Sequence, residues 1–237
     1  MMRDPEPWVN DFAIRSFRDI ADGDYIAARM ACRAALLPQY LWASQQAIEK
    51  YLKCILLLQR IPAPKVRHNL AAALQKIEES GKLAMDLSAP TRAFVAYIDD
   101  YGPYRYMEVS HWGEGRDILK LDRAVFELRQ HCTPEDTPRH KVTEGVMPPK
   151  IRLRGGYLEK IIDSKRKSAN TARAALLWQN AFFGTKTRRF VRIGGWVQSS
   201  SSPLSMTPEL IDHVKQYVYL PNDLIAWCTN EAQKKRP

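Results

Sequence analysis

Apolar residues in the first 130 positions recur every three or four residues, which is the spacing of amphipathic helices. Between Trp8 and Leu37 this spacing predicts one long helix, or two helices with a break at Gly23. A second helix is predicted from Tyr40 to Leu58. Its inward stripe comprises Leu41, Ser44, Ile48, Tyr51, Leu52 and Ile55. Glu49 and Lys53 lie four residues apart on another face and are expected to form an ion pair.

Three more helices are predicted before residue 133. The first runs from about Arg67 through Glu79, and Gly81 suits its C-cap. The second begins near Ser88 and must end or kink at Gly102-Pro103. The third spans Asp117 to about Arg129. Their inward residues are expected to be Leu70, Ala73, Leu74 and Ile77, then Phe94, Val95 and Ile98, then Ile118, Leu121, Val125, Phe126 and Leu128.

The chain beyond residue 132 changes in composition. Residues 133–150 contain Thr-Pro, Thr-Pro and Met-Pro-Pro with few apolar side chains, which is typical of a linker or long loop. Residues 157–183 are predicted to be largely helical, and residues 185–198 to form a hairpin around Gly194-Gly195. We therefore predict a mainly α protein with three parts, at 1–132, 133–150 and 151–237.

Charge sets the last of these parts apart. Residues 148–237 hold 16 Lys and Arg against 6 Asp and Glu, whereas residues 1–147 hold 20 of each. The whole net charge of +10 therefore lies in the C-terminal region. Such asymmetry favours a polyanionic partner, nucleic acid before an anionic membrane, with a merely solvated basic face as the alternative.

The termini and cysteines exclude several classes of protein. The N-terminus carries acids and prolines without an apolar core, so we expect no signal peptide. The longest apolar run, residues 54–58, is too short to cross a bilayer, and we expect a soluble cytoplasmic protein without membrane contact. No two of the four cysteines are closely spaced, so no zinc knuckle or CxxC pair can form locally, and we expect neither cofactor nor metal. Cys32 and Cys54 are expected to pack as small hydrophobic residues.

Residues 101–112 contain the densest group of chemically useful side chains. Arg105 and His111 stand six residues apart, and Tyr101, Tyr104, Tyr106 and Trp112 surround them. Histidine suits proton transfer because its unperturbed pKa is about 6.5, and arginine suits a phosphate because its guanidinium donates two charge-assisted hydrogen bonds. The alternative is structural: Arg105 pairs with Asp99, Asp100 or Glu108, and His111 caps a helix end.

Two basic clusters could track a phosphate backbone. The first is Lys165, Arg166 and Lys167. The second, on the predicted hairpin, is Lys186, Arg188, Arg189 and Arg192, with Phe190 between them. Tyr104 and Tyr106 could stack on bases. The alternatives are interhelical packing for the tyrosines and a solvated hairpin edge for the basic side chains. His68 is interpreted as a helix-entry residue rather than a third catalytic group, and His131, His140 and His213 are isolated.

Three features in order along residues 17–112 resemble the HEPN superfamily, a group of all-α domains. The first is Asp24-Tyr-Ile-Ala-Ala-Arg29 followed by Ser44-Gln-Gln-Ala-Ile-Glu-Lys-Tyr-Leu-Lys53. The second is His68-Asn-Leu70, which opens a helix. The third is Tyr104-Arg105-Tyr106 followed by His111. The long pattern from Ser44 is fairly specific, and the resemblance covers roughly the first 130 residues.

The resemblance implies an up-and-down bundle of four or five helices that commonly forms a homodimer. In many members an Arg-x(4–6)-His motif cleaves RNA without metal, in a cleft shared by the two subunits. Arg105 and His111 satisfy this spacing. Such members are often toxins or defence effectors, frequently paired with a small nucleotidyltransferase. Tyr106 departs from the polar residue that active members often carry directly after the arginine.

Three functions are therefore compatible with the sequence. The first is a metal-independent endoribonuclease of the toxin or defence type. The second is a HEPN-like module that binds RNA, a nucleotide or a partner protein without chemistry. The third is a plain helical scaffold, such as the non-catalytic half of a two-component pair.

Overall fold

The computed structural model describes residues 6–101, 112–133, 156–164, 172–184, 197–199 and 226 of the 237-residue chain. Its first helix, α1 (Glu6–Ala13), runs through a π-helical turn (Ile14–Arg18) into α2 (Asp19–Arg33). The later elements are α3 (Leu37–Leu58), α4 (Leu70–Glu79), α5 (Ala89–Tyr101), β1 (Trp112–Glu114), a 3-10 turn (Gly115–Asp117), α6 (Ile118–Arg129), α8 (Tyr157–Asp163), α9 (Ala172–Leu177) and β2 (Val197–Ser199). The predicted mainly α fold is confirmed.

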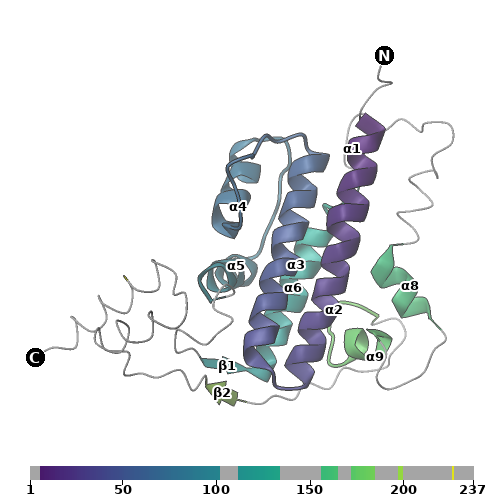
Figure 1. The fold of residues 1–237 in the computed structure, drawn as a ribbon, viewed down its shortest axis with the longest axis vertical. Coiled ribbons are helices and arrows are strands. Elements are labelled where there is room, and N and C mark those ends of the chain that lie inside the picture. The colour runs from purple at the N-terminus through teal and green to yellow at the C-terminus, as the bar shows by residue number, and fades with distance from the viewer. Residues whose placement is uncertain are drawn as a thin grey trace, which may run out of the picture.

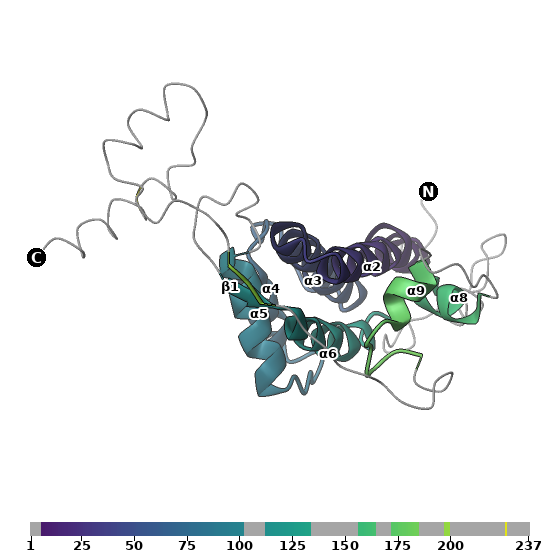
Figure 2. The same ribbon diagram turned by 90° about the horizontal axis from the view of Figure 1, so that it is seen from below.

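Helices α2 and α3 form the central pair of the bundle (Figure 1). Viewed from below, α2 and α3 make one layer and α5 and α6 the other, with α8 and α9 against the side of α2 (Figure 2). The turn between α2 and α3 is tight: Ala35 has a φ of +56°, and Leu36 N donates to Ala31 O at 2.9 Å. Pro38 then stands in the first turn of α3, where its missing N–H costs no hydrogen bond.

The core consists largely of the side chains that the helical spacing selects. The predicted stripe of α3 is buried throughout, as are the four predicted inward residues of α4. Glu49 and Lys53 form the expected ion pair at 2.5 Å. Cys32 and Cys54 are fully buried, so their predicted role as small packing residues is confirmed.

Several sequence predictions are wrong in detail. The first helical stretch is continuous, as the first of the two alternatives predicts, but it contains a π-helical turn, and Gly23 lies inside α2 without a break. Helix α4 begins at Leu70 rather than Arg67, because Asn69 supplies its N-cap. Phe126 of α6 is 45% exposed, and its ring contacts the rings of Phe182 and Phe183, with centroids 5.5 and 5.9 Å away.

The C-terminal elements also differ from the prediction. The stretch predicted to be largely helical, residues 157–183, contains two short helices, α8 and α9, in its described residues. Strand β2, from the end of the predicted hairpin, pairs antiparallel with β1, with Trp112 opposite Ser199. Residues 185–196, which include the predicted turn, lie outside the described residues. A partner 85 positions earlier in the chain could not be inferred from local alternation.

A buried polar cluster joins α2, α6 and α9. The guanidinium of Arg29 pairs with the carboxylate of Asp122, and both side chains are fully buried. Tyr25 donates its hydroxyl to the same Asp122 oxygen at 2.6 Å. Arg29 also donates to the backbone oxygens of Ala175 and Trp178, at the end of α9. Burial and the Asp122 charge raise the pKa of Tyr25 well above its usual value, so the phenol keeps the proton that it donates.

A second polar cluster attaches α8. Arg129 of α6 donates from Nε and Nη2 to the two oxygens of Asp22, at 2.7 and 2.9 Å. It also forms two hydrogen bonds with Glu159 of α8, at 2.6 and 2.8 Å. Tyr51 of α3 donates to Asp22 at 2.7 Å. Residues 156–184, as far as they are described, therefore pack on the bundle, with Leu158 and Leu176 fully buried. The three-part division itself stays a prediction.

Among the helices that the structure describes, none is both long enough and apolar enough to cross a membrane.

The Arg29–Asp122 pair gives a first prediction. Asp122→Ala removes the carboxylate and leaves the buried guanidinium of Arg29 without its counter-charge. We expect a loss of about 3–5 kcal/mol in the free energy of unfolding, measured by urea denaturation. Asp86→Ala, at an exposed position, is the control and should change stability by less than about 0.5 kcal/mol. Equal effects of the two substitutions would contradict the structural role of the pair.

Candidate functional site

The predicted catalytic residues belong to one connection of the bundle. Arg105 and His111, together with Tyr104 and Tyr106, lie in the segment 102–111, which we call the motif segment. This segment lies outside the described residues. The structure does describe its two flanks: α5 ends at Tyr101 and β1 begins at Trp112. The elements that hold these two flanks therefore form the described part of the candidate site.

Helix α5 is fixed to the start of α4 by a carboxylate. Asp99 accepts hydrogen bonds from the backbone N–H groups of Leu70 and Ala71, at 2.8 and 3.0 Å. Asn69 accepts a third, from Ala72 N, at 2.6 Å. A negative charge is favourable at a helix N-terminus, where N–H groups lack partners in the helix. Asp99, one of the carboxylates considered as a partner for Arg105, thus serves the α4 N-terminus.

The other flank is held by close packing and a capping box. Gly113 of β1 lies against the buried Leu37, and a Cβ placed on Gly113 would stand 2.6 Å from Leu37 Cδ1. Glu114 N donates to Asp117 Oδ2 at 2.9 Å, while the Glu114 side chain accepts from the Asp117 backbone. This reciprocal cap starts the helical turn that leads into α6. The chain is therefore held directly after the motif segment.

An aromatic series runs along α5 toward the motif segment. The rings of Phe94 and Tyr97 have centroids 6.3 Å apart, and those of Tyr97 and Tyr101 are 5.1 Å apart. Burial, and then the nearby charge of Asp117, raises the pKa of Tyr97 to about 12. The Tyr97 phenol is therefore protonated at neutral pH, and the series ends at the residue before the motif segment.

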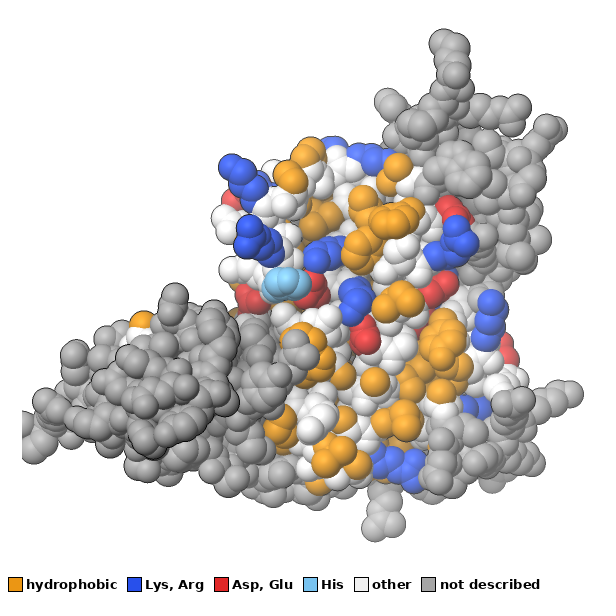
Figure 3. Space-filling model, in the orientation of Figure 1, with side chains coloured by type: hydrophobic (Ala, Val, Ile, Leu, Met, Phe, Trp, Pro, Cys, Tyr) orange, Lys and Arg blue, Asp and Glu red, His pale blue; other side chains and the backbone are white. Residues whose placement is uncertain are grey.

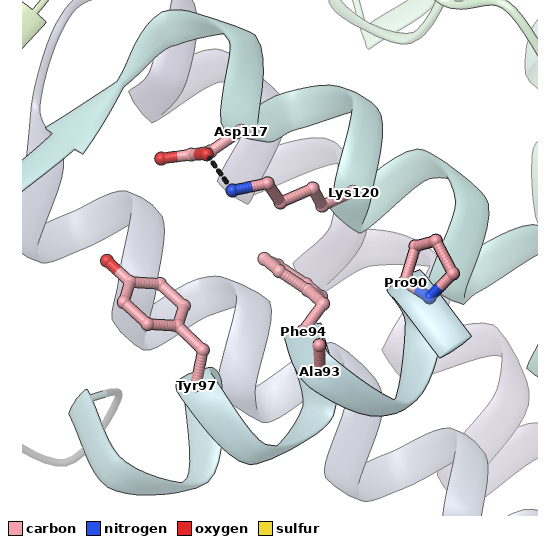
Figure 4. Close-up of a pocket in the computed structure, with 6 residues that line it drawn as sticks. All are labelled: Pro90, Ala93, Phe94, Tyr97, Asp117 and Lys120. Atoms are coloured by element: carbon pink, nitrogen blue, oxygen red, sulfur yellow. Dashed lines mark ion pairs between the residues drawn. The ribbon is translucent and has the colours of Figure 1, made fainter. Parts of the chain in front are cut away.

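A pocket of about 280 Å³ opens between α5 and α6 beside this series (Figure 4). The rings of Phe94 and Tyr97 point from α5 toward an ion pair on the opposite wall, between Asp117 Oδ1 and Lys120 Nζ at 2.7 Å. Its lining residues are Pro90, Ala93, Phe94, Tyr97, Asp117 and Lys120. Apolar walls with a few placed polar groups are the usual composition of a small-ligand site.

His68 stands directly before the N-cap of α4, at the helix entry that the sequence predicts. Asn69, not His68, is the N-cap of α4. The His68 ring lies with Nδ1 3.1 and 3.2 Å from the two carboxylate oxygens of Glu49, and its side chain is 75% exposed. Glu49 is also the partner of Lys53. His68 therefore links the entry of α4 to Glu49 of α3, beside the Glu49–Lys53 ion pair.

The predicted nucleic-acid-binding residues of the C-terminal region lie outside the described part of the chain. These are Lys165, Arg166, Lys167, Lys186, Arg188, Arg189 and Arg192. Their roles stay predictions. Within the described residues, no three His, Cys, Asp or Glu side chains gather in a way that could hold a metal ion.

Sequence reasoning missed the pocket, although signals for parts of it exist. Phe94, Tyr97 and Tyr101 stand at positions i, i+3 and i+7, which places their rings on one face of a helix. Asp117 and Lys120 stand three apart at a helix start, a spacing typical of ion pairs. Whether the Asp117–Lys120 pair faces the aromatic rings depends on how α5 packs on α6. No local sequence pattern specifies this packing.

These features define a helical bundle in which the connection after α5 carries an arginine and a histidine. A comparison with protein-family models matches residues 14–131 to the HEPN domain. The chain belongs to this family through its bundle, as the resemblance predicted. No match was found among curated proteins or among solved structures.

The anchoring of β1 gives a second prediction. Gly113→Ala forces a methyl group against Leu37, so we expect a loss of about 1–3 kcal/mol in the free energy of unfolding. In a Leu37→Ala background the space is free, and the same substitution should cost almost nothing. Urea denaturation of the four proteins of this double-mutant cycle measures the coupling. An equal cost in both backgrounds would show that the contact does not hold β1.

Proposed function

We propose that this protein is a metal-independent endoribonuclease whose catalytic residues are Arg105 and His111. The observation that carries the proposal is the Arg-x(5)-His spacing inside the region matched to the HEPN domain, a family often involved in ribonuclease or defence activity. The basic C-terminal region adds an attraction for a polyanion. The structure holds both flanks of the motif segment, through Asp99 before it and Gly113 after it, and these anchors support the proposal.

The two residues divide the chemistry of RNA cleavage between them. The 2′-hydroxyl attacks the adjacent phosphorus, the P–O5′ bond breaks, and a 2′,3′-cyclic phosphate and a 5′-hydroxyl result. The imidazole of His111 transfers the proton at one of the two oxygens, because the unperturbed pKa of histidine, about 6.5, lies near ambient pH, and the proton at the other oxygen is exchanged with water. The guanidinium of Arg105 binds the non-bridging phosphate oxygens and stabilises the charge that builds up on them.

We further propose that the protein acts as a homodimer. The solvent side of α1 and α2 forms a stripe without charge, which we call the α2 face. It comprises Phe12, Ser16, Ile20, Gly23, Ala27, Met30 and Ala34. Three of these, Phe12, Ile20 and Met30, are about half exposed, at 54%, 49% and 49%. Figure 3 shows hydrophobic side chains spread over this side of the molecule. A helix face exposed to water normally carries charged residues, so this composition favours a covering partner.

A second copy of the chain is the partner that fits the α2 face. Gly23 and Ala27 carry little or no side chain, so a second α2 can approach closely at these positions. Leu36, which is 49% exposed, follows the α2 face and adjoins Leu37, which contacts Gly113 just after the motif segment. In a parallel pairing of two such faces, the two Gly113 anchors would lie at the same end of the dimer, consistent with a shared cleft.

For the biological role we propose a toxin or defence effector that pairs with a nucleotidyltransferase-type protein. Family membership and the basic charge of the C-terminal region support this proposal. The second candidate function is a non-catalytic module that binds RNA or a nucleotide. The observation that favours it is Tyr106, which stands where active members often carry a polar residue.

The third prediction tests catalysis. We expect the full chain to cleave RNA in EDTA and to leave 2′,3′-cyclic phosphate ends, visible by gel and mass spectrometry. His111→Ala and Arg105→Ala should each lower the rate by about 10²-fold or more. His68→Ala is the matched control, because His68 is an exposed histidine whose ring contacts the carboxylate of Glu49, and it should keep full activity. Cleavage at the wild-type rate by His111→Ala would overturn the assignment, and RNA binding without any product would favour the second candidate.

The fourth prediction tests the dimer. Ala27→Glu places a charge in the middle of the α2 face, so two copies would bury two carboxylates without partners. We expect this variant to be monomeric in analytical ultracentrifugation at concentrations where the wild type is dimeric. Ala96→Glu, at an exposed position on α5, is the control and should stay dimeric. A monomeric wild type, or a dimeric Ala27→Glu protein, would contradict an interface on the α2 face.

A further inference from the structure

We propose that the pocket between α5 and α6 binds a guanine base of the RNA, and so selects where the chain cuts. This inference rests on the proposed RNA-directed function, because it assigns the base specificity of that site. The pocket lies beside Tyr97, two turns or less of α5 before the motif segment. A base held there would leave its own or the next phosphate close to the chain that carries Arg105 and His111.

The size and walls of the pocket suit one planar ring system. Its volume, about 280 Å³, lies just below the range of roughly 300–1,000 Å³ that is usual for ligand sites, so it has room for one small ring system only. Pro90, Ala93 and the ring of Phe94 form an apolar floor, and the Tyr97 ring stands beside them (Figure 4). Bases stack on aromatic side chains in single-stranded recognition, with about 1–3 kcal/mol for each stacked base. The neighbouring Tyr101 ring, 5.1 Å from Tyr97, extends the same platform.

The hydrogen-bonding groups at the polar edge of the pocket complement those of guanine. Asp117 presents a carboxylate acceptor, and Lys120 presents an ammonium donor directly beside it. Guanine presents two adjacent donors, N1–H and N2–H₂, next to the O6 acceptor. The donors match the two oxygens of Asp117, and O6 matches Lys120 or the protonated Tyr97 hydroxyl. Each Asp117 oxygen already accepts one hydrogen bond, from Lys120 or from Glu114 N, and a carboxylate oxygen can accept two.

The other three bases match this edge less well. Adenine and cytosine offer a single exocyclic amino group as donor, and uracil offers a single ring N–H between two acceptors. None of them presents two neighbouring donors to one carboxylate. A carboxylate that faces a base acceptor instead of a donor repels it, which adds to the discrimination. The pocket should therefore bind guanine more tightly than the other three bases.

The fifth prediction measures base binding directly. The full chain carrying His111→Ala, which separates binding from cleavage, is titrated by calorimetry with GMP, AMP, UMP and CMP. We expect GMP to bind at least tenfold more tightly than the other three. Asp117→Asn replaces one acceptor oxygen by an amide donor and should remove most of this preference. Ala93→Trp fills the floor of the pocket from an exposed position, so it should weaken GMP binding at least tenfold without altering the helical circular dichroism.

The outcomes separate this inference from the proposed function. Equal affinity for the four nucleotides, or GMP binding unchanged in Ala93→Trp, overturns the guanine pocket even if the wild type cleaves RNA. Because Ala93 takes no part in the capping box, Ala93→Trp keeps the test valid if Asp117→Asn fails to fold. Guanine preference with no cleavage by the wild type would support the pocket and overturn the nuclease. If the guanine pocket and the nuclease are both correct, the mapped cleavage sites should lie next to guanines. The Ala93→Trp protein should then cleave without this preference.

Discussion

A guanidinium and a carboxylate that are both fully buried, those of Arg29 and Asp122, join α2 to α6 at the centre of the bundle. Two charges can be removed from water together only if nearly all their hydrogen-bonding groups find partners in the protein. Tyr25 supplies one hydroxyl donor, and the end of α9 supplies two carbonyl acceptors. The packing of the C-terminal helix on the bundle therefore follows from the need to satisfy a charge placed near the N-terminus.

The same logic explains why the residues that carry the family resemblance are what they are. In the first pattern, Tyr25 and Arg29 stand four apart and both reach Asp122. In the long pattern from Ser44, Lys50 pairs with Asp24 and Tyr51 donates to Asp22. The pattern that opens α4 contains its N-cap, Asn69. These side chains fix helices to one another, so this part of the resemblance is a signature of the fold. The proposed chemistry rests on Arg105 and His111.

Contacts between residues that are close in the sequence can be predicted from the sequence, whereas contacts between distant segments cannot. The buried stripes of α3 and α4 and the Glu49–Lys53 pair arise within one helix, and the helical period predicts them. The exposure of Phe126 and the pairing of β1 with β2 depend on segments more than fifty residues away, so periodicity misassigned the first and missed the second. The same holds for the pocket. The residues of each wall can be predicted from local spacing, but the packing of α5 against α6 cannot. The arginine and the histidine are predicted from their spacing, because both stand within one short segment of the sequence.

The hydrogen bond from Arg29 to Ala175 also limits how early the core can be completed during synthesis of the chain. The two residues are 146 positions apart. At roughly 5–20 residues per second, a ribosome needs on the order of 7–30 seconds to add the carbonyl acceptors after Arg29 has been made. Through that time the bundle helices can form, but their central guanidinium still lacks part of its hydrogen-bonding shell. The centre of the core is thus completed late in synthesis, and the nascent protein depends on its last third to complete the centre of its first.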